Sequence, residues 1–479
     1  MAGAVAPAPT RLRLPHPVVL LGGAVVVAAL LTWILPAGQY DRRDDAATGR
    51  RVVVAGTYHR TQAAPVGLFA AAVAIPRGFI AAADVIGLVL LVGGAWVVVD
   101  RLGTLPAVVA ALVGRFAGRG LWVIPLVSLF FGTMGALENM QEEIIPLVPV
   151  LMALGTGIGV DGVSVVAMSA GAAMVGSAFG PTNPFQAGIA LKLAQMPPLG
   201  RGGLRLAMFI VGLALWIGLT MRHAARTRAV VKKDVRLKPD ATGAPQRMGA
   251  PQPTSTPQPG TTDTAVVPAL DARHAFILAI VLAPMAAYVY GALRLDWGLN
   301  ELSGAFLIAG IAAGLVGGMS VAGTVTTYLE GMQSVLPAAI MVGVARSISL
   351  VLEDGRVVDT ILNSLVTPLA YLPAISAALL MIPFHALIHV AVPSVSGQAV
   401  LTMPLFVPVA DLLGFSREAA VLAYQTGAGL TELITPTNGA LMAVLLAAGV
   451  PFHSWLRFVV WGVGVLALVG VLAIAIALT

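Results

Sequence analysis

The sequence has 479 residues, of which 58% are hydrophobic and only 10% are charged. Soluble domains carry about a quarter of charged residues, so this composition excludes a water-soluble protein and predicts an integral membrane protein. The net charge of +6 does not indicate nucleic-acid binding, because positive charges gather directly after an apolar stretch, without interleaved aromatic residues for base stacking. The chain has no cysteine, which excludes disulfides and thiolate metal sites.

The first predicted membrane helix covers residues 17–36, and the polar residues 37–66 after it are expected to form a periplasmic loop. The apolar run is about twenty residues long, more than the core of a signal peptide needs. A retained helix with a cytoplasmic N-terminus is therefore the preferred interpretation. Further stretches long enough to cross a hydrocarbon core of about 30 Å cover residues 85–99, 204–221, 276–293 and 459–478.

A re-entrant hairpin is predicted at about residues 121–155. Its second apolar piece is too short to span a membrane untilted, and its polar tip contains Glu138, Glu142 and Glu143. An interrupted apolar helix follows at about residues 163–194. We expect the hairpin and the interrupted helix to form one functional unit of the first half of the chain.

Residues 222–271 predict a flexible cytoplasmic linker, because they are basic at the start and then rich in Pro, Thr and Gln without apolar periodicity. The linker separates a first membrane repeat, residues 1–221, from a second, residues 272–479. The second repeat contains its own hairpin at about residues 383–403 and its own interrupted helix at about residues 418–447.

Both interrupted helices contain the same Pro-Thr-Asn break. Proline removes a backbone donor and clashes with the preceding turn, and the groups that it frees are tolerated in a membrane only where protein or a water-filled cavity satisfies them. Matching breaks in two halves indicate the substrate site of a secondary transporter. The breaks comprise Gly180, Pro181, Thr182, Asn183 and Pro184 in the first helix, and Thr435, Pro436, Thr437, Asn438 and Gly439 in the second.

The two repeats are predicted to have opposite orientations in the membrane. Counted from a cytoplasmic N-terminus, the span that starts at Val85 begins outside, whereas the corresponding span at Leu336 begins inside. Inverted repeats allow one site at the middle of the membrane to open to each side in turn. A single proline kink could serve packing alone, but two matched kinks favour transport. The predicted fold is thus an all-α polytopic membrane protein with inverted repeats.

The hairpin tips and nearby ionisable residues supply the remaining candidates. Ionisable residues inside a membrane are costly and mark transport pathways. The acidic first tip and Glu432 favour a cationic substrate, a proton relay or a cation co-ion, unless the glutamates of the tip lie at the water interface. Arg346, within an apolar span, could pair with a buried carboxylate or with a carboxylate of the substrate. The second tip offers Ser394, Ser396, Gly397 and Gln398.

Enzymatic and channel functions find no support in the sequence. His385 and His389 lie one helical turn apart and could ligate a metal, but no third ligand accompanies them, and hydrogen bonding across helices is the preferred interpretation. No catalytic triad survives inspection, and no periodic polar stripe suggests a pore. No cofactor is expected beyond Na⁺ or H⁺ as a coupling ion.

Several specific motifs occur in order along nearly the whole chain. By these motifs the chain resembles the YfcC-type branch of the C4-dicarboxylate anaerobic carrier (DcuC-like) family, within the ion transporter superfamily. They include Pro15-His16-Pro17, Leu35-Pro36-Ala37-Gly38-Gln39-Tyr40, Glu142-Glu143-Ile144-Ile145-Pro146, Asn183-Pro184-Phe185, Ser396-Gly397-Gln398-Ala399 and Pro436-Thr437-Asn438-Gly439.

This resemblance implies a scaffold and dimerisation part that holds a transport part, made of both hairpins and both broken helices and moving as an elevator. It also implies a homodimer in the bacterial inner membrane. Related branches include dicarboxylate carriers and basic amino-acid exchangers of the arginine/ornithine type. The chain departs from the family pattern at Gly180-Pro181-Thr182, where Ser-Thr-Leu is expected, and the departure bears on ion coupling.

The sequence therefore predicts a secondary transporter of small organic ions, with a basic amino-acid antiporter as the leading interpretation. No arginine lies at either break, whereas acidic residues do. The alternative is a Na⁺- or H⁺-coupled carrier of C4-dicarboxylates or other carboxylates. The expected partners are the small-molecule substrate and the lipid bilayer, with no nucleic acid and no metal beyond a transported or coupling Na⁺. The predicted site combines Glu142, Glu143 and Glu432 with both breaks and the second hairpin tip.

Overall fold

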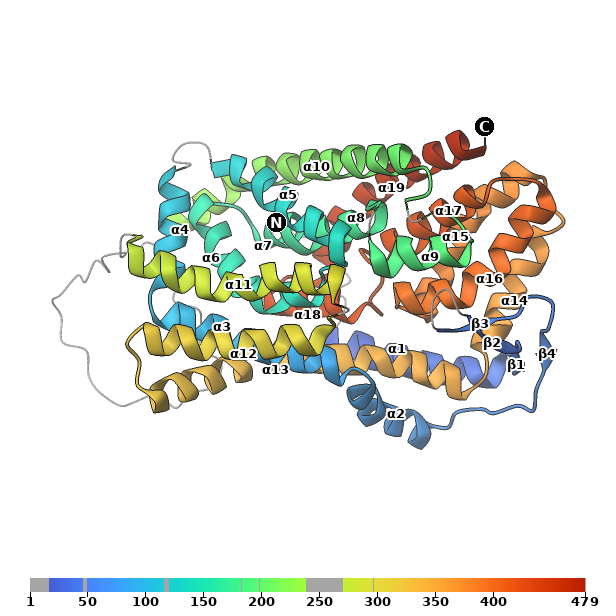
Figure 1. The fold of residues 1–479 in the computed structure, drawn as a ribbon, viewed down its shortest axis with the longest axis horizontal. Coiled ribbons are helices and arrows are strands. Elements are labelled where there is room, and N and C mark those ends of the chain that lie inside the picture. The colour runs from blue at the N-terminus through green and yellow to red at the C-terminus, as the bar shows by residue number, and fades with distance from the viewer. Residues whose placement is uncertain are drawn as a thin grey trace, which may run out of the picture.

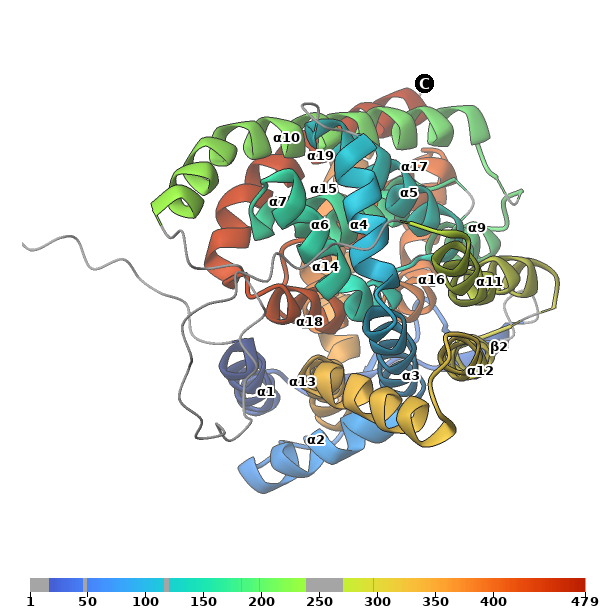
Figure 2. The ribbon, with the colours of Figure 1, turned by 90° about the vertical axis from the view of Figure 1, so that its left-hand side faces the viewer.

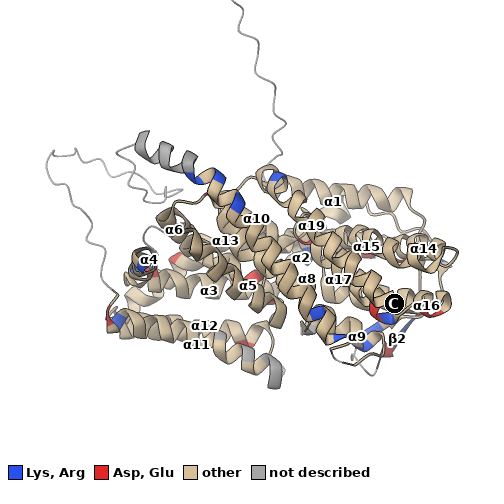
Figure 3. Ribbon diagram, turned by 90° about the horizontal axis from the view of Figure 1, so that it is seen from above, with Lys and Arg blue, Asp and Glu red and all other residues tan. Residues whose placement is uncertain are grey.

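Long helices run side by side along the longest axis of the molecule in this computed structural model (Figure 1). Within the described residues, nine helices are long and apolar enough to cross a membrane, as the composition predicts. These helices contain few charged residues along most of their length (Figure 3). One of them, α12 (Leu299–Val316), lies outside the spans singled out from the sequence. The structure describes residues 17–45, 50–115, 120–181, 183–197, 199–237, 270–295 and 297–478.

One side of the molecule is a panel of helices built around α13, and it is seen end-on in Figure 2. Glycines allow close crossings within this panel, since a Cβ atom on Gly78 would meet the backbone of Gly343. The panel forms one wall of the cavity described below. Its members are α1 (Pro17–Ile34), α2 (Leu68–Ala81), α3 (Ala83–Arg101), α11 (Ala272–Arg294), α12 and α13 (Val321–Asp354), with α4 (Thr104–Arg115) at one end.

The first predicted hairpin and the first predicted broken helix are both present. Left-handed Asn139 ends the first arm of the hairpin, and non-helical backbone at Gly180 and Asn183 marks the interruption of the broken helix. The hairpin consists of η1 (Gly120–Trp122), α5 (Val123–Glu138), η2 (Glu142–Leu147) and α6 (Val148–Ile158). The broken helix consists of α7 (Gly162–Val166), η3 (Ala167–Gly171), α8 (Ala172–Phe179), η4 (Pro184–Gly188) and α9 (Ile189–Leu193).

The second half contains the corresponding elements. The arms of its hairpin are longer than the predicted 383–403, whereas its broken helix agrees closely with the predicted 418–447. The hairpin consists of α15 (Ala374–Ala391) and α16 (Val395–Leu413), preceded by α14 (Val358–Leu369), and the broken helix of α17 (Arg417–Thr431) and α18 (Gly439–Ala447). Two long helices, α10 (Gly202–Leu237) and α19 (Phe452–Leu478), pack on the broken helices from outside.

The predicted start of the linker at residue 222 is wrong. Helix α10 continues to Leu237, so residues 222–237 are helical, and residues 238–269 lie outside the described part of the chain. Arg, Lys and Ala are good helix formers, and they let the helix continue beyond its apolar portion. The basic composition of this segment is therefore as compatible with a helix as with a linker.

The predicted loop 37–66 contains two short antiparallel strand pairs that pack against α14 and α16. The backbone amide of Tyr40 and the guanidinium of Arg42 both donate to the carboxylate of Asp359, each at 2.9 Å. Burial raises the pKa of Tyr40 to about 12, with smaller contributions from Asp359 and Tyr58. These contacts fasten the first half of the chain to the second. The pairs are β1 (Gly38–Gln39) with β4 (His59–Arg60), and β2 (Arg42–Asp45) with β3 (Arg50–Val53).

Close packing of α5 on α8 leads to a testable prediction. A Cβ atom on Gly176 would overlap the carbonyl oxygen of Gly132, and backbone atoms cannot move aside as a flexible side chain can. We expect Gly176→Ala to destabilise the protein by about 1–3 kcal/mol, the usual cost of overpacking. Thermal unfolding in detergent measures this.

The matched control is Gly218→Ala on α10, where a Cβ atom would meet nothing within 4 Å. This variant should be neutral or slightly stabilising, because alanine is the better helix former. Equal melting temperatures for the two variants would show that the α5–α8 contact is looser than described.

Candidate functional site

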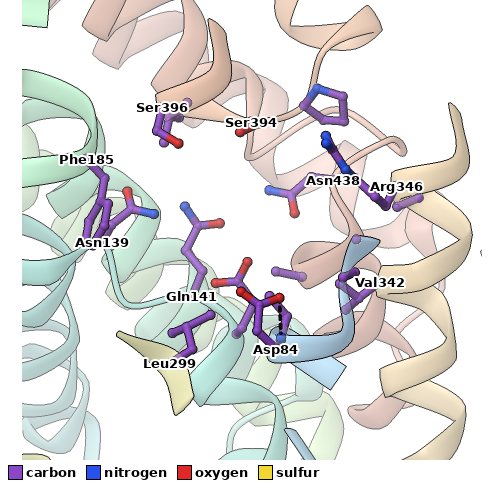
Figure 4. Close-up of a pocket in the computed structure, with 18 of the residues that line it drawn as sticks. Asp84, Asn139, Gln141, Phe185, Leu299, Val342, Arg346, Ser394, Ser396 and Asn438 are labelled. Atoms are coloured by element: carbon purple, nitrogen blue, oxygen red, sulfur yellow. Dashed lines mark hydrogen bonds between the residues drawn. The ribbon is translucent and has the colours of Figure 1, made fainter. Parts of the chain in front are cut away.

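A cavity of about 780 Å³ lies between the helix panel and the tips of the two hairpins. The junction of α2 and α3, the middle of α13 and the facing ends of α11 and α12 line one wall. The first hairpin tip, the second hairpin tip and the second helix break line the other (Figure 4). The cavity therefore collects residues from both halves of the chain, as expected for a site between two repeats.

Four carboxyl groups line this cavity. Three of them are the predicted Glu142, Glu143 and Glu432, and the fourth is Asp84, at the start of α3. Glu143 and Glu432 are buried, with 7% and 5% of their surfaces exposed. Glu143 accepts a hydrogen bond from the backbone amide of Gln141 at 3.0 Å, and the side-chain amide of Gln141 donates to Glu432. Gln141 thus connects the first hairpin tip to the second broken helix.

The cavity has one arginine, Arg346 of α13. It is half-buried, and within the described residues it forms no ion pair or hydrogen bond. Figure 4 shows Arg346 beside Asn438, whereas Asp84 lies across the open space, nearer to Gln141. A cation on one side and carboxylates on the other give the cavity two ends of opposite charge. The sequence analysis left Arg346 between a structural and a substrate-binding role, and its place on the cavity wall makes the second role available.

The second break forms part of the cavity wall. Thr437, Asn438 and Gly439 line the cavity, and the side chain of Asn438 caps α18 by accepting from the amide of Leu441 at 3.1 Å. Thr435 lies directly behind, and its hydroxyl contacts that of Thr437 at 2.7 Å. The N-terminus of α18 therefore points its positive end toward the cavity region, a geometry that favours anionic groups.

The first break lies behind the wall. Asn183 is fully buried, and its side-chain oxygen accepts from the amides of Phe185 and Gln186, each at 2.9 Å. Its amide nitrogen donates to the side-chain oxygen of Asn139 at 3.1 Å, and Asn139 lines the cavity. Of the first broken helix, Phe185 alone lines this cavity among the described residues.

Carbonyl groups freed by the first break are bound by the second broken helix. The side-chain nitrogen of Gln425 on α17 donates to the carbonyl oxygens of Ala178 at 3.3 Å and Gly180 at 3.4 Å. In return, Gln186 donates to the backbone oxygen of Gln425 at 3.3 Å. The two broken helices thus satisfy each other's buried backbone groups, which a membrane interior requires.

The predicted site residues divide into three groups. Those that do not line the cavity are the buried Gly180, Asn183, Gln398 and Thr435 and the half-buried Pro181, Gly397 and Pro436. Thr182 lies outside the described residues, and Pro184 is described only as the start of η4. Those that line the cavity are Glu142, Glu143, Ser394, Ser396, Glu432, Thr437, Asn438 and Gly439.

The expectation that His385 and His389 take part in hydrogen bonds agrees with the structure. His389 Nδ1 lies 2.8 Å from the side-chain oxygen of Gln398, and the side-chain nitrogen of Gln398 donates to the backbone oxygen of His385 at 2.9 Å. No group of three or more potential metal ligands occurs among the described residues. The two histidines of α15 are thus hydrogen-bonded to Gln398 of α16, the other arm of the second hairpin.

Sequence reasoning missed three side chains of the site. Asp84 lies in the first turn of α3, Gln141 lies within the polar first tip, and Asn139 precedes it. A carboxylate at the start of a predicted span could have signalled Asp84. The amides carried no signal of their own, because their roles come from partners elsewhere in the chain: Gln141 donates to Glu432, 291 residues away, and Asn139 accepts from Asn183.

The chain is similar to known proteins along nearly its whole length. Residues 14–479 match the family model described as C4-dicarboxylate anaerobic carrier. The chain is 28% identical, over 93% of each chain, to an Escherichia coli (strain K12) protein described as "Putative basic amino acid antiporter YfcC". It is 24% identical, over 95% of each, to an uncharacterised protein of Haemophilus influenzae.

Two solved transporter structures also match over most of their length. The Alcanivorax borkumensis YdaH transporter has a TM-score of 0.39 and 18% identity, with 96% of this chain and 98% of that chain covered. Neisseria gonorrhoeae MtrF, described within a class of antimetabolite efflux pumps, has a TM-score of 0.42 and 15% identity, with 97% and 95% covered.

Proposed function

The chain belongs to the C4-dicarboxylate anaerobic carrier family, and from this premise we propose that it exchanges basic amino acids of the arginine/ornithine type across the membrane. Like the members of its family, it is an integral membrane transporter and not an enzyme. The finer question is which organic ion it carries. The observation that carries the proposal is the charge of the cavity, which has four carboxyl groups and one guanidinium.

This charge distribution complements a basic amino acid. Arg346 can bind the α-carboxylate bidentately, as guanidinium groups do, and the start of α18 adds favourable amide groups. The carboxylates of Asp84, Glu142 and Glu432 can bind the α-ammonium and the side-chain cation. Burying such charges is costly unless each finds a partner, so a ligand with one negative and two positive groups suits this cavity best.

A dicarboxylate is the second candidate, favoured by the family description. Two carboxylates would need two cationic partners, and among the described residues the cavity has Arg346 alone. The other carboxylate would have to rely on backbone amides and a bound Na⁺. The excess of acidic side chains opposes this candidate by simple Coulomb repulsion.

The proposal includes an arrangement in the membrane. Residues 1–221 and 272–479 form inverted repeats around the linker, and the hairpins with the broken helices move as an elevator against a scaffold that forms a homodimer. The N-terminus and the linker face the cytoplasm of a bacterial inner membrane. The strands β1–β4 and the basic part of α10 lie at opposite ends of the molecule (Figures 1 and 3), which supports this orientation.

Thermal unfolding with a ligand panel tests the substrate class. A ligand that binds only the folded protein at about 100 times its Kd stabilises it by about 2.7 kcal/mol. We expect arginine, ornithine and lysine to raise the melting temperature, and citrulline, which lacks the side-chain cation, to raise it less. Succinate and fumarate should leave it unchanged, with or without Na⁺.

The panel is followed by exchange in proteoliposomes, where external arginine should release internal labelled ornithine. Stabilisation by succinate alone, dependent on Na⁺, would replace the proposal by a sodium-coupled carboxylate carrier.

A further inference from the structure

A network of buried polar groups lies behind the second hairpin tip. The binding of an amino acid in the cavity does not require this network. His385 and His389 of α15 and Gln398 of α16 are all fully buried, and they lie outside the lining of the cavity. Their hydrogen bonds end beside Glu432, which lines it. Buried polar atoms that lack a hydrogen-bond partner are rare in folded proteins and call for an explanation.

The hydrogen bonds fix the orientation of the Gln398 amide. Its nitrogen faces the backbone oxygen of His385 at 2.9 Å, and only a donor can bind there. The amide oxygen therefore faces His389 Nδ1, at 2.8 Å. Since an amide oxygen only accepts, Nδ1 of His389 carries a hydrogen. The network thus assigns the neutral tautomer of His389.

This tautomer leaves Nε2 of His389 as an acceptor without a partner. Nε2 is buried and unpaired, and it lies 3.7 Å from Oε1 of Glu432. The other oxygen of Glu432, Oε2, accepts from Gln141. Two acceptors thus face each other in a buried position, and no described donor lies between them. A shared proton would satisfy both, since unpaired buried polar groups are costly.

We propose that His389 and Glu432 hold one exchangeable proton between them, and that a cationic group of the substrate displaces this proton when it binds Glu432. This inference rests on the proposed function and adds its coupling ion. The proton leaves through the cavity as the substrate cation arrives, and no bond to carbon forms or breaks. Because one carboxylate serves both cations in turn, inward movement of one favours outward movement of the other.

The surroundings of the pair contain few other charges. Helix α16 contributes the neutral Gln398, and α19, which also packs on α15, carries His453 and the exposed Arg457 near its start. Asp359 of α14 is paired with Arg42. The remaining titratable groups that face the pair are His385 on α15, Tyr424 on α17, whose ring lies 5.4 Å from that of His385, Glu142 and Glu143 of the first tip, and Arg346 across the cavity.

The variant His389→Gln tests the proposal in proteoliposomes loaded with a pH-sensitive dye. In the wild type, arginine accumulation should follow the pH gradient, by about tenfold per pH unit for exchange of one proton. In His389→Gln this gradient-driven accumulation should be lost, while arginine–arginine counterflow, which moves no net proton, stays within about twofold of the wild type. The control, His453→Gln on α19, should keep both activities.

Distinct results would overturn the proposal. Accumulation that follows the pH gradient in His389→Gln as it does in the wild type would exclude a proton at this pair. Accumulation that follows a Na⁺ gradient, and is lost in His389→Gln, would assign the pair to sodium instead. Absence of arginine counterflow in the wild type would refute the proposed substrate, and the proton site would then be judged by a measurement without substrate.

That measurement is the pH dependence of thermal unfolding in detergent. A proton shared in the folded state would be lost as pH rises, so under the proposal wild-type stability should decrease with increasing pH. In Glu432→Gln, the side-chain nitrogen can donate to Nε2 of His389 and imitate the protonated carboxyl group. This variant should fold and show a smaller slope, and an unchanged slope would contradict the proton site.

Discussion

Replacing Glu418 by glutamine is expected to destabilise the protein by about 3 to 5 kcal/mol, the usual cost of leaving a buried charge without its partner. Glu418 begins α17 and Arg205 lies on α10, with 2% and 1% of their side chains exposed. Arg205 Nε donates to Glu418 Oε1 at 2.8 Å, and Arg205 also donates to Gln425. Glutamine would leave the buried guanidinium without a partner of negative charge.

Unfolding in detergent, followed by heat or denaturant, measures this loss. The matched control is Glu330→Gln, because Glu330 forms an ion pair with Arg101 in which the two side chains are 48% and 54% exposed. Exposed pairs contribute at most about 1 kcal/mol. The double variant Arg205→Met with Glu418→Leu should recover most of the lost stability. Equal effects of the two glutamine variants would show that the Arg205–Glu418 pair is hydrated rather than buried.

The second large effect is expected at the two charged ends of the cavity. Removing one partner of a buried charge pair costs about 2 to 5 kcal/mol of binding, which is about thirtyfold or more in transport efficiency. Arg346→Gln should weaken arginine and citrulline alike, because both present the same α-carboxylate. Glu142→Gln should weaken arginine more than citrulline, because it removes a partner of the side-chain cation.

Competition against labelled arginine in proteoliposomes gives both values in one assay. Arg457→Gln is the control, since Arg457 is exposed on α19 and lies away from the cavity lining. If Glu142→Gln lowered the affinity for arginine and citrulline equally, Glu142 would act on the α-ammonium or on the fold and not on the side-chain cation.

Local signals explain what could be predicted. Proline and asparagine determine helix ends through their own backbone and side-chain chemistry, so the second broken helix was predicted at 418–447 and is found at 417–447. The acidic tip was predicted because charges within an apolar stretch are rare. These features depend only on residues that are close together in the sequence, so they can be predicted without knowing the fold.

The parts that could not be predicted depend on distant partners. Gln425 is one of several glutamines in the sequence, and its role arises because α17 crosses the first break, 245 residues earlier. Asp84 belongs to the site because the junction of α2 and α3 faces the hairpin tips. The start of the linker could not be predicted, because basic residues suit a helix and a linker equally.

The attachment of the strands to α14 has a consequence for the biosynthesis of the protein. Tyr40 and Asp359 are separated by 319 residues, so the early segment emerges long before its docking helix exists. Tyr40 and Arg42 have no carboxylate partner until the ribosome has synthesised the chain as far as Asp359. The first half therefore cannot reach its final form alone, and a chain truncated before α14 would keep this segment open to proteases.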